Sequence, residues 1–123
     1  RTVRQQLEQS CAAVQQQQAL ASQQLSWVVQ NSKDSSVKAI AQLRLARIQR
    51  ETGDLTAALA TVNQAMPASF AAAQAELKGD ILQQSGDLVA AKAAYQLAFD
   101  NAGQNTQLLQ IKLDELAHIS AAN

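Results

Sequence analysis

The chain has 123 residues, and its ten basic and ten acidic residues give a net charge of zero at pH 7. Because nucleic-acid binding relies on a positive field that displaces counterions, this balance argues against nucleic acid as a partner. The 25 Ala and 20 Gln residues far outnumber the 4 Gly and 1 Pro, and an aromatic content of 3% is thin for a β-sandwich core, so the composition favours one all-helical domain.

The first third of the sequence carries apolar residues at helical spacing. They predict one helix over residues 1–14 and a second over 21–30, from two sets of positions: Val3, Leu7, Cys11 and Val14, then Ala21, Leu25 and Val28. We interpret residues 1–36 as a degenerate helical hairpin, although no Gly or Pro marks its turn. The chain opens on Arg1 in a helical pattern, which indicates an excised domain that lacks an upstream targeting or anchoring segment. No apolar run approaches the roughly 18 to 20 residues that a bilayer span needs.

One pattern is written twice after this hairpin, with a shift of 33 residues. Such a period is typical of stacked helical hairpins. Gly53 and Gly86 are expected to end a helix in the left-handed conformation that Gly adopts most readily, and Asp54 and Asp87 to cap the helix that follows. The predicted helices cover residues 37–52 and 54–66 in the first repeat and 69–85 and 87–101 in the second.

Small residues mark where the two helices of each repeat meet. Ala46 and Ala58 in the first repeat correspond to Gly79 and Ala91 in the second, and the space left is expected to be filled by Val62 with Ala65 and by Tyr95 with Ala98. This spacing resembles the tetratricopeptide (TPR) consensus of a small residue, Gly-Asp, Ala, an aromatic residue and Ala. The resemblance implies a TPR-like α-solenoid of about three helical hairpins plus a C-terminal capping helix. Its expected parts are the degenerate hairpin 1–36, repeats 37–69 and 70–103, and a capping helix over 106–119, all within one domain over 1–123.

Residues suited to catalysis or metal binding are few. His118 is the only histidine and has no Cys or second His near it in the chain, so a metal site lacks its ligands. Cys11 continues an apolar stripe and is interpreted as a small core residue, since no nearby base would lower its pKa. Trp27 is expected to fill the core or an interface between repeats. The sequence therefore predicts no catalytic residue, no metal, no cofactor and no enzyme activity.

The first helix of each hairpin lines the concave surface of a TPR-like stack, and such grooves bind extended peptides or partner helices. We therefore predict contacts with a protein partner at six residues: Leu43, Arg47, Arg50, Glu76, Asp80 and Gln83. The alternative is that the acids and bases in this set neutralise one another between neighbouring helices and contact no partner.

A more specific resemblance is carried by Leu43-Arg44-Leu45-Ala46-Arg47-Ile48-Gln49, by Glu76-Leu77-Lys78-Gly79-Asp80-Ile81-Leu82 and by Ala91-Lys92-Ala93-Ala94-Tyr95. These strings resemble the YfgM family of ancillary Sec translocon subunits, which are bacterial inner-membrane proteins with one transmembrane helix and a periplasmic TPR-like domain.

The YfgM resemblance implies a periplasmic interaction domain of the bacterial inner membrane, in contact with the membrane only through an anchor absent from this chain. The implied partners are translocon subunits, a periplasmic chaperone such as PpiD, and exported polypeptides. The alternative is a structural or self-associating TPR-like scaffold, a homo-oligomer among the options, with no open peptide groove.

Overall fold

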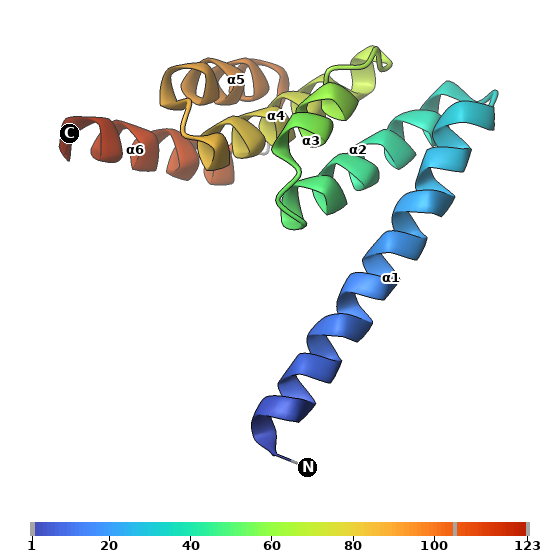
Figure 1. The fold of residues 1–123 in the computed structure, drawn as a ribbon. Helices are drawn as coiled ribbons and strands as arrows, with labels where there is room; N and C mark the ends of the chain where they lie inside the picture. The colour runs from blue at the N-terminus through green and yellow to red at the C-terminus, as the bar shows by residue number, and fades with distance from the viewer. Residues whose placement is uncertain (1, 105, 123) are drawn as a thin grey trace.

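The computed structural model is a succession of α-helices (Figure 1). It describes residues 2–104 and 106–122, and the side chains of these residues up to Ile119. The helices are α1 (Val3–Asn31), α2 (Ser35–Glu51), α3 (Leu55–Val62), α4 (Ala71–Ser85), α5 (Leu88–Asn101) and α6 (Gln107–Ala122), with a 3-10 turn, η1, at Ala68–Phe70. No strand occurs in the described residues, and the predicted all-α solenoid is confirmed.

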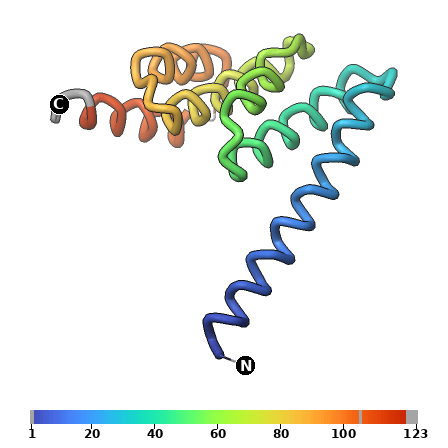
Figure 2. The backbone as a smooth tube through the Cα atoms, viewed as in Figure 1, coloured from blue at the N-terminus to red at the C-terminus, as the bar shows by residue number. Residues whose placement is uncertain are grey.

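The longest element, α1, is one continuous helix where the sequence predicted two. The turn expected inside the hairpin over residues 1–36 is absent, because the run Gln15–Gln18 consists of good helix formers and contains no residue that stops a helix. Thr2 caps the helix: its Oγ1 accepts a hydrogen bond from the Gln5 backbone N–H at 3.2 Å, and the Gln5 side chain accepts one from the Thr2 N–H at 3.1 Å. The first half of α1 consequently extends away from the other helices (Figure 2).

Helices α2 and α3 form one hairpin, and α4 and α5 form a second. Gly53 and Gly86 end the first helix of each repeat with φ of 85° and 92°, the left-handed conformation that was expected. Asp54 and Asp87 then cap the second helix, each accepting a backbone N–H through its Oδ1 at 3.2 Å. The same local chemistry therefore sets both hairpin turns.

Helix α3 is shorter than its prediction of residues 54–66 and ends at Val62. Pro67 disfavours helical geometry at the residue before it. The side chain of Gln74 also takes over the end of α3, because its Nε2 donates to the carbonyl oxygens of Val62 at 2.7 Å and Gln64 at 2.9 Å. Ala65 is therefore exposed in the loop, and the expectation that it packs between the helices is wrong.

The core lies in two clusters that meet at α4. One joins α2, α3 and α4 through Leu43, Ala46, Ala58, Val62, Leu77 and Ile81. The other joins α4, α5 and α6 through Ala75, Leu82, Ala91, Ala94, Tyr95, Ala98, Leu109 and Leu116. The predicted close crossing in the second repeat is confirmed, since a Cβ built on Gly79 would lie 2.6 Å from Cδ1 and Cε1 of the Tyr95 ring.

Candidate partner-binding site

The six residues predicted to face a partner lie on the expected helices, α2 and α4, but they do not form one open surface. Leu43 is 6% exposed and packs in the core between α2, α3 and α4, so it is not available to a partner. Arg47 is exposed, Arg50 is half-buried, and the three residues on α4 are half-buried. The set of six therefore contains one core residue, one exposed residue and four half-buried residues.

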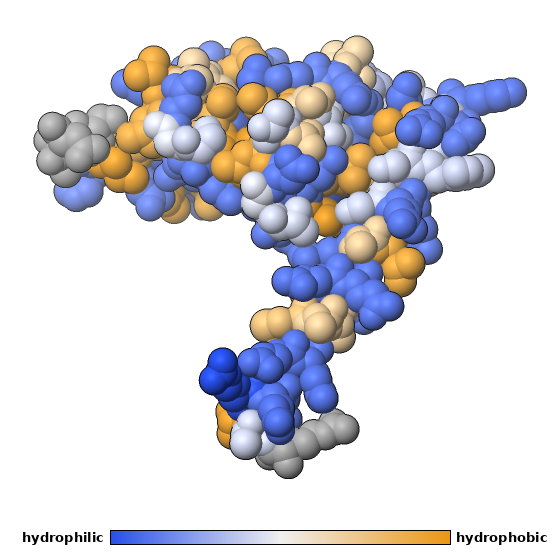
Figure 3. Space-filling view, viewed as in Figure 1, coloured by the Kyte–Doolittle hydropathy of each residue, from blue (hydrophilic) through white to orange (hydrophobic). Residues whose placement is uncertain are grey.

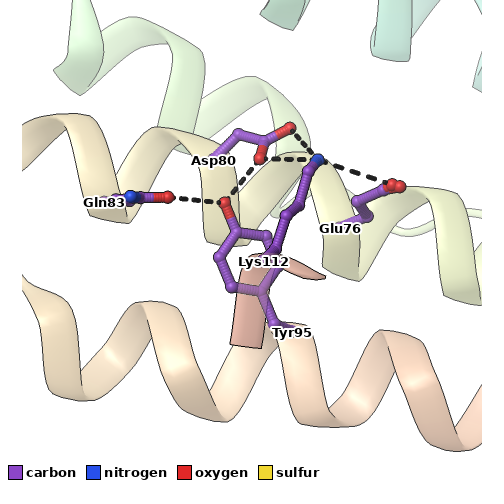
Figure 4. A network of polar contacts seen from close by, with 5 residues as sticks. All are labelled: Glu76, Asp80, Gln83, Tyr95 and Lys112. Carbon is purple, nitrogen blue, oxygen red and sulfur yellow. Dashed lines mark hydrogen bonds and ion pairs between the residues drawn. The ribbon is translucent and has the colours of Figure 1, made fainter. Parts of the chain in front are cut away.

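The α4 positions belong to a polar network with α5 and α6 (Figure 4). The Tyr95 hydroxyl on α5 donates to Asp80 Oδ1 at 2.5 Å and lies 3.1 Å from Gln83 Oε1. Lys112 Nζ on α6 donates to the two carboxylate oxygens of Asp80 at 2.9 and 3.2 Å and lies 3.7 Å from Glu76 Oε2. Each of the five residues in this cluster therefore has a polar partner within it.

The electrostatics of this network fix the Tyr95 phenol in its neutral form. Burial, followed by the hydrogen bond to Asp80 and the negative charge of that carboxylate, raises the pKa of Tyr95 well above its usual value. Lys112 Nζ lies 5.5 Å from the centre of the Tyr95 ring, where a cation is attracted to the ring face. The network joins α4, α5 and α6, so these charges act on the protein's own helices.

Sequence reasoning missed Lys112, and the acids of α4 pair with it rather than with Arg47 or Arg50. Acids and bases of neighbouring helices were expected to neutralise one another. Glu76 and Asp80 do pair with a base, but that base is Lys112 on α6. The repeat spacing gave no signal for it, because one 33-residue period after Asp80 falls on Leu113 and Lys112 lies one residue earlier. The last helix contributes its charge to the acidic positions of α4.

The first repeat has no polar network at the positions equivalent to Asp80 and Tyr95 among the described residues. Val62 stands where the second repeat has Tyr95, and it has no hydroxyl that requires an acceptor. Arg47, in the place of Asp80, is exposed, as is Arg44 one turn earlier. Neither guanidinium has an ion pair or side-chain hydrogen bond with any described residue. The Nε of Arg50 is buried and has no hydrogen-bond partner among the described residues.

Arg44 and Arg47 border a groove of about 550 Å³ between α1 and α2. We call this the α1–α2 groove, and its lining is Ala21, Gln24, Leu25, Val28, Arg44, Arg47 and Ile48. Its floor is aliphatic, its rim carries the two arginines, and its lining contains no acid. Of these residues only Arg47 was predicted, although the apolar stripe at positions 21, 25 and 28 was a usable signal for the floor.

The remaining singled-out residues are exposed. Cys11 lies on the surface of α1, so its interpretation as a core residue is wrong. Trp27 is 66% exposed, which contradicts its expected role as a filler of the core. His118 on α6 is exposed as well. In Figure 3 the projecting part of α1 is largely hydrophilic with separate hydrophobic patches, whereas hydrophobic atoms are more frequent over the other helices.

These features define the class of protein. Paired helices with a Gly-Asp turn stack on one another, and the polar cluster of α4, α5 and α6 holds these helices together. The α1–α2 groove remains accessible. This combination is typical of helical-repeat proteins that bind other proteins. None of the helices within the described ranges combines the length and the apolar character that a membrane crossing demands.

The chain belongs to the Tetratricopeptide repeat-like domain family, whose sequence model matches residues 2–118. It is 38% identical over 93 residues to the ancillary SecYEG translocon subunit of Haemophilus influenzae, covering 75% of this chain and 46% of that protein. The ancillary SecYEG translocon subunit of Escherichia coli K12 is 32% identical over 108 residues, covering 86% of this chain and 48% of that protein. The predicted likeness to the YfgM family is thereby confirmed.

A third relative, the ancillary SecYEG translocon subunit of Neisseria gonorrhoeae, is 35% identical over 95 residues, which cover 75% of this chain and 46% of that protein. The chain spans about half the length of the curated relatives it matches. No solved structure matches the chain with significance.

Proposed function

We propose that this chain is the protein-binding part of an ancillary Sec translocon subunit, that it lies on the periplasmic side of the bacterial inner membrane, and that it is not an enzyme. Its partners are translocon subunits, a periplasmic chaperone such as PpiD, and exported polypeptides. The names of the relatives and the TPR-like family support the proposal. The observation that carries it is the α1–α2 groove, with an apolar floor and two arginines that pair with none of the described residues.

The α1–α2 groove suits a protein partner better than the α4 surface does. At α4 the carboxylate of Asp80 already binds Tyr95 and Lys112, so a ligand would have to displace an internal ion pair. Within the described part of the chain Arg44 and Arg47 have no side-chain partner to give up, and their charges cost little while they are solvated. A peptide that supplies acceptors to them gains contacts without breaking any within the chain.

The α4 network also favours a second function, that of a structural scaffold without an open groove. Lys112 on α6 covers the acidic positions of α4 in the way that a closing helix ends a solenoid. On this reading Arg44 and Arg47 serve solubility only, and the α1–α2 groove contacts no other protein.

Photocrosslinking in the intact membrane separates the two functions. A photoreactive amino acid replaces Gln24, which lines the α1–α2 groove, or Val89 on α5, which is 85% exposed and serves as the control. The proposal expects adducts with translocon or periplasmic chaperone subunits from position 24 and far fewer from position 89. Equal yields from both positions, or no adduct from position 24, would support the scaffold function and end the proposal.

A further inference from the structure

One apolar stripe runs along most of α1 and continues the floor of the α1–α2 groove. Its positions alternate in steps of four and three residues: Leu7, Cys11, Val14, Gln18, Ala21, Leu25 and Val28. This spacing places all seven side chains on one face of the helix, in the seven-residue pattern by which helices pair. Six of the seven are apolar or small, so the face is suited to a second helix along its whole length.

The stripe has a neighbour along only half of its length. Ala21, Leu25 and Val28 are half-buried beside α2, which ends at Glu51. There the Nε2 of Gln18 donates to a carboxylate oxygen of Glu51 at 3.2 Å and links the middle of α1 to the end of α2. Residues 3–17 continue for about 22 Å beyond this point at the rise of an α-helix.

The free half of the stripe exposes hydrophobic side chains to water. Leu7 is 61% and Val14 is 52% exposed, and Cys11 between them is exposed too. A helix that lay on this half would remove these side chains from water, and the same helix would reach the α1–α2 groove because the stripe is continuous. The distance from Leu7 to Val28 along the helix axis is about 32 Å, which a partner helix of about 20 residues spans.

Charge distinguishes the two halves of this surface. Arg4 and Glu8 pair with each other at 3.1 Å, and the sequence carries no charged residue between Glu8 and Lys33. In the α1–α2 groove, by contrast, Arg44 and Arg47 add two positive charges with no acid in the lining. An occupant that matches both halves is apolar on one face along its length and acidic beside the groove.

Charge also argues against a second α1 as the occupant. The only acid on α1 is Glu8, which is paired with Arg4. Two α1 helices that met along their stripes would offer no carboxylate to Arg44 or Arg47. The charge complementarity of the groove therefore favours a different chain.

We propose that the α1 stripe and the α1–α2 groove together seat one amphipathic helix of a partner protein, with acidic residues of that helix against Arg44 and Arg47. This inference rests on the proposed function and adds the chemistry of the partner. Acidic residues beside the arginines would set the orientation of the partner helix and its specificity. Apolar contacts with Leu25, Val28 and the projecting half of α1 would supply most of the surface removed from water.

Designed peptides test the charge requirement. Three helical peptides of about 20 residues share one leucine stripe and differ only in their flanking residues, which are Glu, Gln or Lys. Fluorescence anisotropy should show the Glu peptide binding about tenfold more tightly than the Gln peptide, as expected for two charge pairs beside an apolar surface, and the Lys peptide binding least. Equal affinities for the Glu and Gln peptides would overturn the inference.

Charge reversal tests the position. The double variant Arg44→Glu, Arg47→Glu should prefer the Lys peptide, whereas Lys38→Glu, Lys92→Glu makes the same change in net charge at exposed lysines outside the groove and should keep the wild-type order of affinities. If the lysine variant behaves like the arginine variant, the preference among the peptides comes from net charge alone, and the peptide does not bind at the α1–α2 groove.

Peptide length tests the projecting half of α1. A Glu peptide of about 10 residues covers only the groove, so Val14→Ser should weaken the longer peptide about threefold or more and leave the shorter one unchanged. If Val14→Ser lowers the affinity of both peptides equally, or of neither, residues 3–17 of α1 are not part of the binding site.

Light scattering of the protein alone completes the experiment. A dimer that dissociates on Arg44→Glu, Arg47→Glu would make a second copy of this chain the occupant and refute the inference. Peptide binding without photocrosslinks to translocon or chaperone subunits would instead count against the proposed function only, so the two failures are distinguishable.

Discussion

The crossing of α4 and α5 permits a test of how one core contact sets the shape of a repeat. A Cβ on Gly79 would lie 2.6 Å from two carbons of the Tyr95 ring, closer than packed atoms approach. The ring is fully buried, and its hydroxyl is held by Asp80 and Gln83, so it has no free space into which to move. We therefore expect Gly79→Ala to destabilise the protein, although Ala is the better helix former.

Two opposing effects give the magnitude. Overpacking a core by one methyl group costs about 1 to 3 kcal/mol, and replacing Gly by Ala inside a helix contributes about 1 kcal/mol in favour of folding. The net loss for Gly79→Ala is thus about 1 kcal/mol in the free energy of unfolding. In a Tyr95→Val background the ring is gone and only the helix preference remains, so the same substitution should stabilise by about 1 kcal/mol.

The natural control for this pair is the first repeat, where Ala46 and Val62 occupy the equivalent positions and both are fully buried. Urea denaturation followed by far-ultraviolet circular dichroism, applied to the wild type, the two single variants and the double variant, measures the coupling, which we expect to be about 2 kcal/mol. If Gly79→Ala changes stability with the same sign and size in both backgrounds, the ring does not determine the crossing and our reasoning fails.

Three further outcomes are expected. Gly86→Val should cost about 1 to 2 kcal/mol because a β-branched side chain is strained at positive φ, and an unchanged thermal melt would contradict the turn. Asp80→Ala should cost about 2 to 3 kcal/mol because it removes the nearest acceptor of both the Tyr95 hydroxyl and Lys112, whereas Arg47→Ala should change stability by less than about 0.5 kcal/mol; equal effects in urea would refute this assignment. Because the folded pKa of Tyr95 is raised, stability should hold below the ordinary tyrosine pKa of about 10 and fall above it, as the unfolded chain releases the proton first. Tyr95 is the only tyrosine, so tyrosinate absorbance near pH 10 in a protein that is still helical would disprove this.

The repeat region was predictable because its signals are local. Gly53 and Gly86 each require a backbone conformation that few other residues tolerate, and the Asp that follows each one satisfies the next helix start. Such features act within a few residues of chain, so they are legible in the sequence. The shortening of α3 was harder to foresee, because Gln74 ends it from another helix.

The fate of α1 could not be predicted from its periodicity. An apolar stripe shows which face of a helix could be buried, but it does not show whether a neighbour exists to bury it. Cys11 was expected inside for this reason, and it is exposed since α2 ends before it can cover the first half of α1. Trp27 lies in the half of α1 beside α2 but is not one of the stripe positions, and it is 66% exposed. The Gln15–Gln18 run favours a continuous helix and supplies no turn.

The helices that carry the candidate site could be predicted, but the ion pairs and hydrogen bonds of its side chains could not. Repeat spacing placed Arg47 and Asp80 at equivalent positions, yet the choice of a partner depends on side-chain reach across elements. Lys112 reaches Asp80 from α6, which lies outside the two matching repeats, and Arg47 borders a groove whose other wall is α1. Neither α1 nor α6 shares the repeat pattern, so their contributions required the structure.

The two repeats differ in ways that depend on one another. A tyrosine in the core needs a glycine opposite its ring and acceptors for its hydroxyl, and Gly79 with Asp80 meets both needs beside Tyr95. A valine needs neither, so Val62 allows an alanine at the crossing and frees the next position from serving as an acceptor. Arg47 takes that position and lies in the α1–α2 groove. The size of one core residue thus governs whether the neighbouring surface closes on the protein's own charges or remains available to another chain.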